Sequence, residues 1–323
     1  MNPGFSVIFL TTLIGAGQGL FLALYAAELA QALNIIETSP HRMFFAGGSL
    51  ISLVFTGLGA IASLFHLGHP ERAWRALAMW RTSWLSREGI ALPSFMLVVF
   101  VYALAHYLGW AGTRVIGAFA VVLCVTLFVC TGMIYACIKF LQEWASPLTV
   151  VNYAVLGCAS GFTLATAFSA VAADSLVVAY GMAAIGFTAL GLVTRSASLV
   201  RNSRLKPKST LQSATGIHHP RIVQKSMGFM GGSYNTREFF HGRRKTFLRS
   251  IKWAFLGLAF AAPLLMLLVG VGMGMGVGVG VSAASASVLG LAFLVQYAGL
   301  IAERWFFFAQ ANHPQNLYYQ AIS

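Results

Sequence analysis

Charged residues are scarce in this sequence. Only 9% of its 323 residues are Asp, Glu, Lys or Arg, whereas about a quarter of the residues of a typical soluble domain are charged. Acidic residues are the rarer kind, with 8 Asp and Glu against 21 Lys and Arg. Hydrophobic residues make up 58% of the chain, and the mean hydropathy is +0.76. This composition excludes a soluble globular protein and indicates an integral membrane protein.

Residue patterns for bound metals and nucleotides are also missing. The four cysteines lie in apolar runs without a CxxC pair, so the chain has no ligand set for an iron–sulfur cluster of its own. It has no nucleophile elbow, no metal-spaced histidine motif and no phosphate-binding loop. Among the histidines, His41 and His106 are the best-matched pair for haem ligation, but we expect interfacial histidines and no haem. Hydrolysis and metal catalysis therefore have no support in the sequence.

Apolar runs are what the sequence has in abundance. A spanning helix needs about 20 apolar residues, and about eight such runs occur, at 5–32, 43–67, 87–109, 113–138, 148–172, 174–199, 250–279 and 284–309. The short alternating pattern of a membrane barrel is missing. The sequence therefore predicts an all-α, polytopic membrane helix bundle of about eight transmembrane helices, with residues 1–323 as a single integral membrane domain. The first run is longer than the core of a signal peptide and follows no basic residue, so we expect it to remain as a helix.

Positive charge is distributed unequally between the two sides of this bundle. If the loops alternate between the sides, Arg42 and Arg114 lie on one side and the other Lys and Arg on the other. Because basic residues mark the cytoplasmic side, both termini and the loops 66–87, 139–147 and 200–249 are predicted to be cytoplasmic. The long basic loop 200–249 contains interleaved aromatic residues, which favours docking of another protein over binding of anionic lipid. Nucleic acid is the least favoured of the three candidate partners for this loop.

The segment from His66 to Glu88 places ionisable groups at two helix ends. A charge at a helix centre costs roughly 3 kcal/mol on insertion scales, so such groups start as functional candidates. His66 could equally be a C-terminal cap. Ser86 is the expected N-cap of the next helix, which makes Glu88 a first-turn acid stabilised by the helix dipole. Pro93 should distort that helix beside Glu88, and His66 reaches the same membrane surface, so the pair favours a proton-exchanging site.

Indole and guanidinium side chains lie between these two helices. Trp80 and Trp84 continue a helical repeat, whereas Arg72, Arg75 and Arg81 fall largely on other faces. This pattern predicts a short helix at the membrane surface, with Trp at headgroup depth and Arg toward phosphates or a partner protein. A topological anchor alone would also explain it.

Polar residues at other helix ends have simple explanations. We expect Glu28 to be solvated near the outer surface, as acids there usually are. Asn152 and Tyr153 are expected to be interfacial. We expect Glu303 and Arg304 to be a neutralised anchor within an aromatic belt.

The segment FHLGHPERAWRALAMWRTSWLSREGI resembles the signature of the dimethyl sulfoxide reductase anchor-subunit family. The resemblance extends through PKSTLQSATGIHHPRIVQKSMGFMGGSYNTREFFHG and ERWFFFAQANHPQNLYY, and these longer motifs look most similar to membrane subunits of cytoplasm-facing sulfite:quinone oxidoreductases. It implies a bacterial inner-membrane complex of three subunits. These are a catalytic subunit with a bis-molybdopterin guanine dinucleotide molybdenum cofactor, an iron–sulfur electron-transfer subunit, and a quinone-binding anchor. His66 and Glu88 match the residues implicated at the family's quinone site.

The resemblance implies electron transfer from the partner's iron–sulfur clusters to ubiquinone or menaquinone, with His66 and Glu88 supplying protons. The residues expected to bind the quinone or position the docked subunit are Arg72, Arg75, Trp80, Arg81 and Ser86. Two alternatives remain open. A reductase anchor that oxidises quinol would use the same residues, whereas a membrane transporter would need discontinuous helices and an internal repeat, of which the sequence gives no clear sign.

Overall fold

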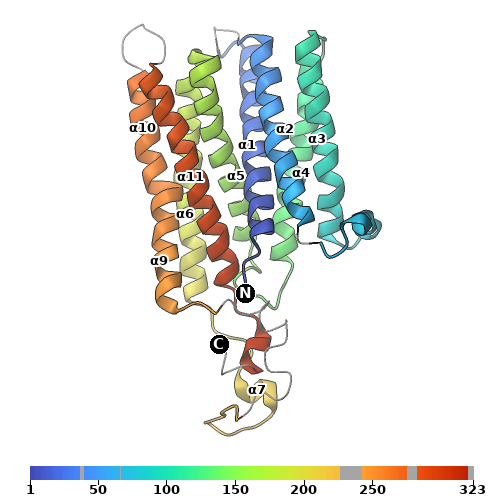
Figure 1. Ribbon diagram of the computed structural model, residues 1–323, viewed down its shortest axis with the longest axis vertical. Helices are drawn as coiled ribbons and strands as arrows, with labels where there is room; N and C mark the ends of the chain where they lie inside the picture. The colour runs from blue at the N-terminus through green and yellow to red at the C-terminus, as the bar shows by residue number, and fades with distance from the viewer. Residues whose placement is uncertain (37–39, 66, 226–241, 275–281, 319–323) are drawn as a thin grey trace.

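The computed structural model describes the chain except residues 37–39, 66, 226–241, 275–281 and 319–323. The described part is a bundle of long helices without a strand (Figure 1). Eight of its helical segments are long and apolar enough to cross a membrane, which confirms the predicted all-α polytopic bundle. These segments are α1 (Phe5–Ala32), α2 (Arg42–Leu64), α3 (Trp84–Leu108), α4 (Thr113–Ala136), α5 (Pro147–Ala172), α6 (Val177–Ser203), α9 (Lys245–Leu256) continued by η3 (Gly257–Ala261) and α10 (Ala262–Gly274), and α11 (Ala283–Ala309).

The two ends of the bundle differ in charge. The end that holds the N-terminus also carries every described Lys and Arg except Arg42 and Arg114 (Figure 1). We call it the basic end, and the other the opposite end. Three short helices lie at the basic end, and η2 (Asp174–Leu176) lies at the opposite end. The three are η1 (Pro70–Met79), α7 (Leu211–Thr215) and η4 (Pro314–Tyr318).

The connection between α6 and α9 is shorter than the predicted loop 200–249. Helix α6 continues to Ser203 and α9 begins at Lys245, because basic residues at the membrane surface extend both helices beyond their apolar segments. The whole of the predicted docking segment GFMGGSYNTREFF falls in residues 226–241, outside the described residues.

Helix α1 is the most deeply buried span, and it packs against α2, α4, α5 and α11. Its contact with α5 depends on glycine. A Cβ on Gly19 would lie 2.3 Å from the Gly157 carbonyl oxygen, and one on Gly161 would lie 2.2 Å from the Gly19 carbonyl carbon. These glycines therefore allow close packing of the two helix backbones.

Candidate functional site

The start of α3 positions the first candidate residue, Glu88. The side chain of Ser83 accepts a hydrogen bond from the backbone N–H of Ser86 at 3.4 Å, so Ser83 is the N-cap and α3 begins at Trp84. The prediction that Ser86 caps this helix was wrong, because Trp84 and Leu85 join the helix before the continuous apolar run begins. Glu88 consequently lies in the second turn, where the free backbone N–H groups of the helix start no longer face it.

Glu88 is buried between α3 and α4. Only 7% of its surface is exposed, and the hydroxyl of Thr131 donates a hydrogen bond to its Oε1 at 2.5 Å. Helix α3 is continuous from Trp84 to Leu108 with Pro93 inside it, so the expected local distortion stays a prediction. A carboxyl group buried at a helix–helix contact with one hydroxyl donor is costly to desolvate, so burial sets Glu88 apart from an ordinary dipole-stabilising acid.

The other predicted site residues are divided between interior and surface. Ser86 is buried beside Glu88 on α3, whereas Trp80 and the three arginines are exposed on η1 and the turn that follows it. Those arginines are Arg72, Arg75 and Arg81. His66 lies outside the described residues, so its pairing with Glu88 stays a prediction.

Arg87 joins this surface turn to α3. Its guanidinium donates hydrogen bonds to the carbonyl oxygens of Trp80 at 2.9 Å and Arg81 at 2.7 Å, and it lies 4.2 Å from the centroid of the Trp84 ring. The sequence analysis missed this residue, although its place next to Glu88 at the start of an apolar run was a usable signal. Arg87 thus positions the indoles of Trp80 and Trp84 where α3 begins, next to its contact with α4.

A groove of about 510 Å³ opens sideways between α3 and α4. Its walls are mainly apolar, and Trp80 is the one predicted binding residue among the described residues that form them. The full set is Trp80, Trp84, Arg87, Ile90, Ala91, Ser94, Leu123, Val125, Thr126, Val129 and Cys130. Glu88 is not part of this wall, but it is adjacent to it in sequence: it follows Arg87 and precedes Ala91 by three residues, and its partner Thr131 follows Cys130 on α4. An apolar groove with a few polar groups is typical of a small-molecule site.

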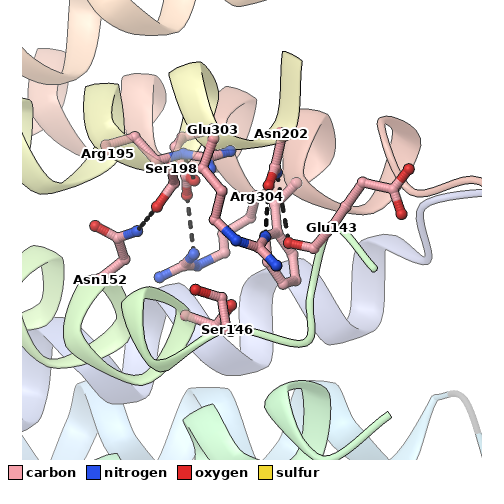
Figure 2. Close-up of a pocket in the computed structure, with 11 residues that line it drawn as sticks. Glu143, Ser146, Asn152, Arg195, Ser198, Asn202, Glu303 and Arg304 are labelled. Carbon is pink, nitrogen blue, oxygen red and sulfur yellow. Dashed lines mark hydrogen bonds and ion pairs between the residues drawn. The ribbon is translucent and has the colours of Figure 1, made fainter. Parts of the chain in front are cut away.

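A second cluster of charged residues is buried at the basic end between α5, α6 and α11 (Figure 2). Arg195 Nε lies 2.6 Å from Glu303 Oε1, and Arg304 Nη1 lies 3.0 Å from Glu303 Oε2. Glu303 is paired with Arg304, as the expected neutralised pair requires, but it is fully buried inside the bundle and has Arg195 as a second partner. Arg195 was not considered from the sequence, although a basic residue within the apolar run 174–199 is itself a signal.

Polar groups continue from this cluster to the surface. Asn152 Nδ2 donates to Ser198 Oγ at 2.7 Å (Figure 2). The guanidinium of Arg201 donates to backbone carbonyls of the turn that precedes α5. Asn152 and Tyr153, expected near the interface, lie in the first two turns of α5 and are buried within the bundle. The side chain of Glu143 extends away from the cluster (Figure 2), and burial raises the pKa of its carboxyl group despite favourable charges from the N-terminal amine and Arg201.

A third cluster surrounds Glu28 at the opposite end. Tyr102 donates to its Oε2 at 2.7 Å, Thr113 donates to Oε1, and His106 Nε2 lies 3.5 Å from Oε1. Glu28 is therefore buried and paired, which contradicts the expected solvated acid. His106 is buried as well, whereas the ring of His41 accepts a hydrogen bond from Met43 and caps α2.

The bundle, its charge asymmetry and its buried ionisable clusters define a polytopic membrane protein with polar chemistry at both ends of its spans. The profile of the DMSO reductase anchor subunit family (DmsC) matches residues 1–218. Over 336 aligned positions, covering 100% of both proteins, the chain is 48% identical to a sulfite dehydrogenase subunit from Allochromatium vinosum. The chain therefore belongs to the DMSO reductase anchor-subunit family, and this confirms the resemblance found in the sequence.

Proposed function

We propose that this chain is the quinone-binding membrane subunit of a molybdenum and iron–sulfur oxidoreductase. The observation that carries the proposal is the buried carboxyl group of Glu88, which accepts a hydrogen bond from Thr131, with Arg87 and Cys130, the residues that precede these two in the chain, both lining the apolar groove. A quinone has a polar ring and an apolar tail, and its two-electron reduction takes up two protons. A groove open toward the lipid suits the tail, and a protected carboxyl group can exchange a proton with the ring.

Each part of the site has a task in this proposal. The indoles of Trp80 and Trp84 border the groove at the basic end, where Arg87 fixes the turn that carries them. Glu88 exchanges one proton, and His66, as the family resemblance implies, exchanges the other. Because the walls of the groove are mainly apolar, we expect the polar quinone ring to bind at the end of the groove that carries a charged side chain, Arg87.

Partner subunits would dock at the basic end. Basic residues favour the cytoplasm as its location, which gives cytoplasmic termini in a bacterial inner membrane. The exposed guanidinium groups of Arg72, Arg75 and Arg81 and the described basic residues of 204–225 and 242–244 offer a basic surface to an iron–sulfur subunit. Family membership supports that arrangement, in which the molybdenum cofactor belongs to a third, catalytic subunit.

The name of the Allochromatium vinosum relative suggests sulfite as the electron donor. In that reaction sulfite and water give sulfate, two protons and two electrons, and the electrons reduce a quinone together with two protons. The family description is of a DMSO reductase anchor, which would carry electrons from quinol in the reverse direction. Sulfite-dependent quinone reduction and quinol-dependent reduction of a sulfoxide in the same membranes distinguish the two directions.

Glu88→Gln tests the site itself. The amide keeps the size of the side chain but cannot carry a proton, so quinone-coupled turnover should fall about 10²-fold, the range of general acid–base contributions. Electron delivery to a soluble one-electron dye, which accepts directly from the partner subunits, should stay at the parent rate. The matched control is Glu71→Gln, which changes an exposed acid of η1 in the same segment.

Unchanged quinone turnover in Glu88→Gln would remove this carboxyl group from the reaction. A parallel loss of dye reduction would instead indicate a complex that no longer assembles. In that case Glu88→Asp, which keeps the acid but shortens it, separates assembly from proton exchange.

A further inference from the structure

Two buried tyrosines lie between Glu88 and the charged cluster around Glu303. Tyr135 belongs to α4 and Tyr153 to α5, and their rings stack with centroids 5.5 Å apart and planes inclined by 10°. Both interact electrostatically with the carboxyl group of Glu88. They are therefore near neighbours of the proposed proton-exchanging group, although no joint role was predicted for them from the sequence.

On the side of the pair toward Glu88, Tyr135 shares a helix face with Thr131. Tyr135 follows Thr131 by four residues on α4, and Thr131 donates a hydrogen bond to Glu88. Hydroxyl groups both donate and accept hydrogen bonds, so this face carries two side chains of the kind that a proton relay needs.

The other side of the pair reaches the cluster at the basic end. The guanidinium carbon of Arg304 lies 3.8 Å from the centroid of the Tyr153 ring, and Glu303 interacts electrostatically with Tyr153. Arg304 also lines a cavity of about 10 Å³, shown in Figure 2. That volume holds about one water molecule.

Unpaired polar atoms make this cavity suited to bind a water molecule. Within the described part of the chain, Asn152 Oδ1 and Arg195 Nη2 are buried without a hydrogen-bond partner, and both residues line the cavity. The hydroxyl of Tyr153 is unpaired in the same way. Buried polar groups normally find a partner in protein or water, so ordered water is the partner that this arrangement calls for.

Large apolar side chains pack on the opposite side of Glu88. Toward Glu28, Phe95, Val99 and Leu127 are fully buried, and these side chains cannot transfer a proton. On the side of the basic end, the tyrosine pair and the cavity beside Glu303 supply polar groups.

On the basis of the function proposed above, we propose that Tyr135 and Tyr153 relay protons between Glu88 and the cavity at the basic end. Each proton moves from a water molecule through the two hydroxyl groups and Thr131 to Glu88, while electrons arrive separately from the iron–sulfur partner. Glu303 neutralises one of the two neighbouring guanidinium charges, which reduces the repulsion that a proton meets there. The two tyrosines do not line the groove, so they act on proton supply and not on quinone binding.

Tyr135→Phe and Tyr153→Phe test this relay in the whole complex in isolated membranes. Each removes one hydroxyl but keeps the stacked ring. With a saturating short-chain quinone, turnover should fall at least fivefold, the solvent deuterium isotope effect should rise, and the KM for quinone should stay the same. The double variant should be no slower than the slower single variant, because both hydroxyls serve one route.

Tyr180→Phe is the matched control. This tyrosine is equally buried, but its hydroxyl donates to the carbonyl oxygen of Ala23 near the opposite end. The relay is refuted if both tyrosine variants match this control in turnover and isotope effect while Glu88→Gln is impaired. If Glu88→Gln also turns over normally, the proposed quinone site itself fails.

Discussion

Three acidic side chains in the described part of this chain are nearly or fully buried, and each has a different kind of partner. Glu88 has a hydroxyl group, Glu28 has an imidazole and hydroxyl groups, and Glu303 has two guanidinium groups. The sequence identified Glu88 because it opens an apolar run. It could not identify Thr131, since a threonine within an apolar helix carries no sign of which distant side chain it meets.

Glu143 supports a prediction at the same scale, outside the membrane spans. Burial raises the pKa of its carboxyl group, so the folded state holds this proton more tightly than the unfolded state. The stability contributed by the protonated form is present below the unfolded pKa and is lost as pH rises through the folded pKa. Glu143→Gln should therefore raise the thermal midpoint of the purified complex, relative to the parent, more at pH 7 than at pH 4.5.

The measurement is the precipitation of this subunit with temperature at the two pH values. Glu71→Gln serves as the exposed control. Its thermal midpoint should differ from that of the parent by the same small amount at both pH values. A larger increase in the thermal midpoint of Glu143→Gln at pH 4.5 than at pH 7 would contradict a raised pKa for Glu143.

At the scale of elements, the apolar runs predicted every span to within a few residues. They did so because length and hydropathy alone decide what crosses a bilayer. Helix ends were less predictable: Ser83, not Ser86, caps α3, and basic residues lengthen α6 and α9. The pairing of helices was not predictable, because small residues indicate close contact without naming the partner.

The α1–α5 contact gives a prediction for these elements. Gly161→Val would place its Cβ against the backbone of Gly19, which cannot move without separating the two helices. We expect the subunit to be lost from the membrane, at a stability cost of several kcal/mol typical of overpacked sites. Quantitative immunoblots of membranes provide the measurement.

Gly186→Val is the control for this prediction. Gly186 lies in α6, and a Cβ there would meet no atom within 4 Å. Parent-like amounts of Gly161→Val would mean that α1 and α5 pack less closely than the structure has them.

At the scale of the whole molecule, polar chemistry is concentrated at the two ends of an apolar bundle. The charge imbalance predicted which loops share an end, and the structure places the described basic residues accordingly, apart from Arg42 and Arg114. What the sequence could not predict is the assembly of Arg195, Tyr153 and Glu303 from three separate spans. Such convergence depends on helix packing, which no single run of residues encodes.

The most direct measurement is photo-crosslinking of a short-chain azidoquinone to the intact complex, followed by mass spectrometry of this subunit. Specific adducts are those that disappear when excess unlabelled quinone is added. If a quinone binds in the groove between α3 and α4, these adducts will map to residues 80–94 and 123–130, which contain the groove walls. Suppressible adducts confined to α6, α9 or α11 would place the quinone elsewhere and contradict the proposed site.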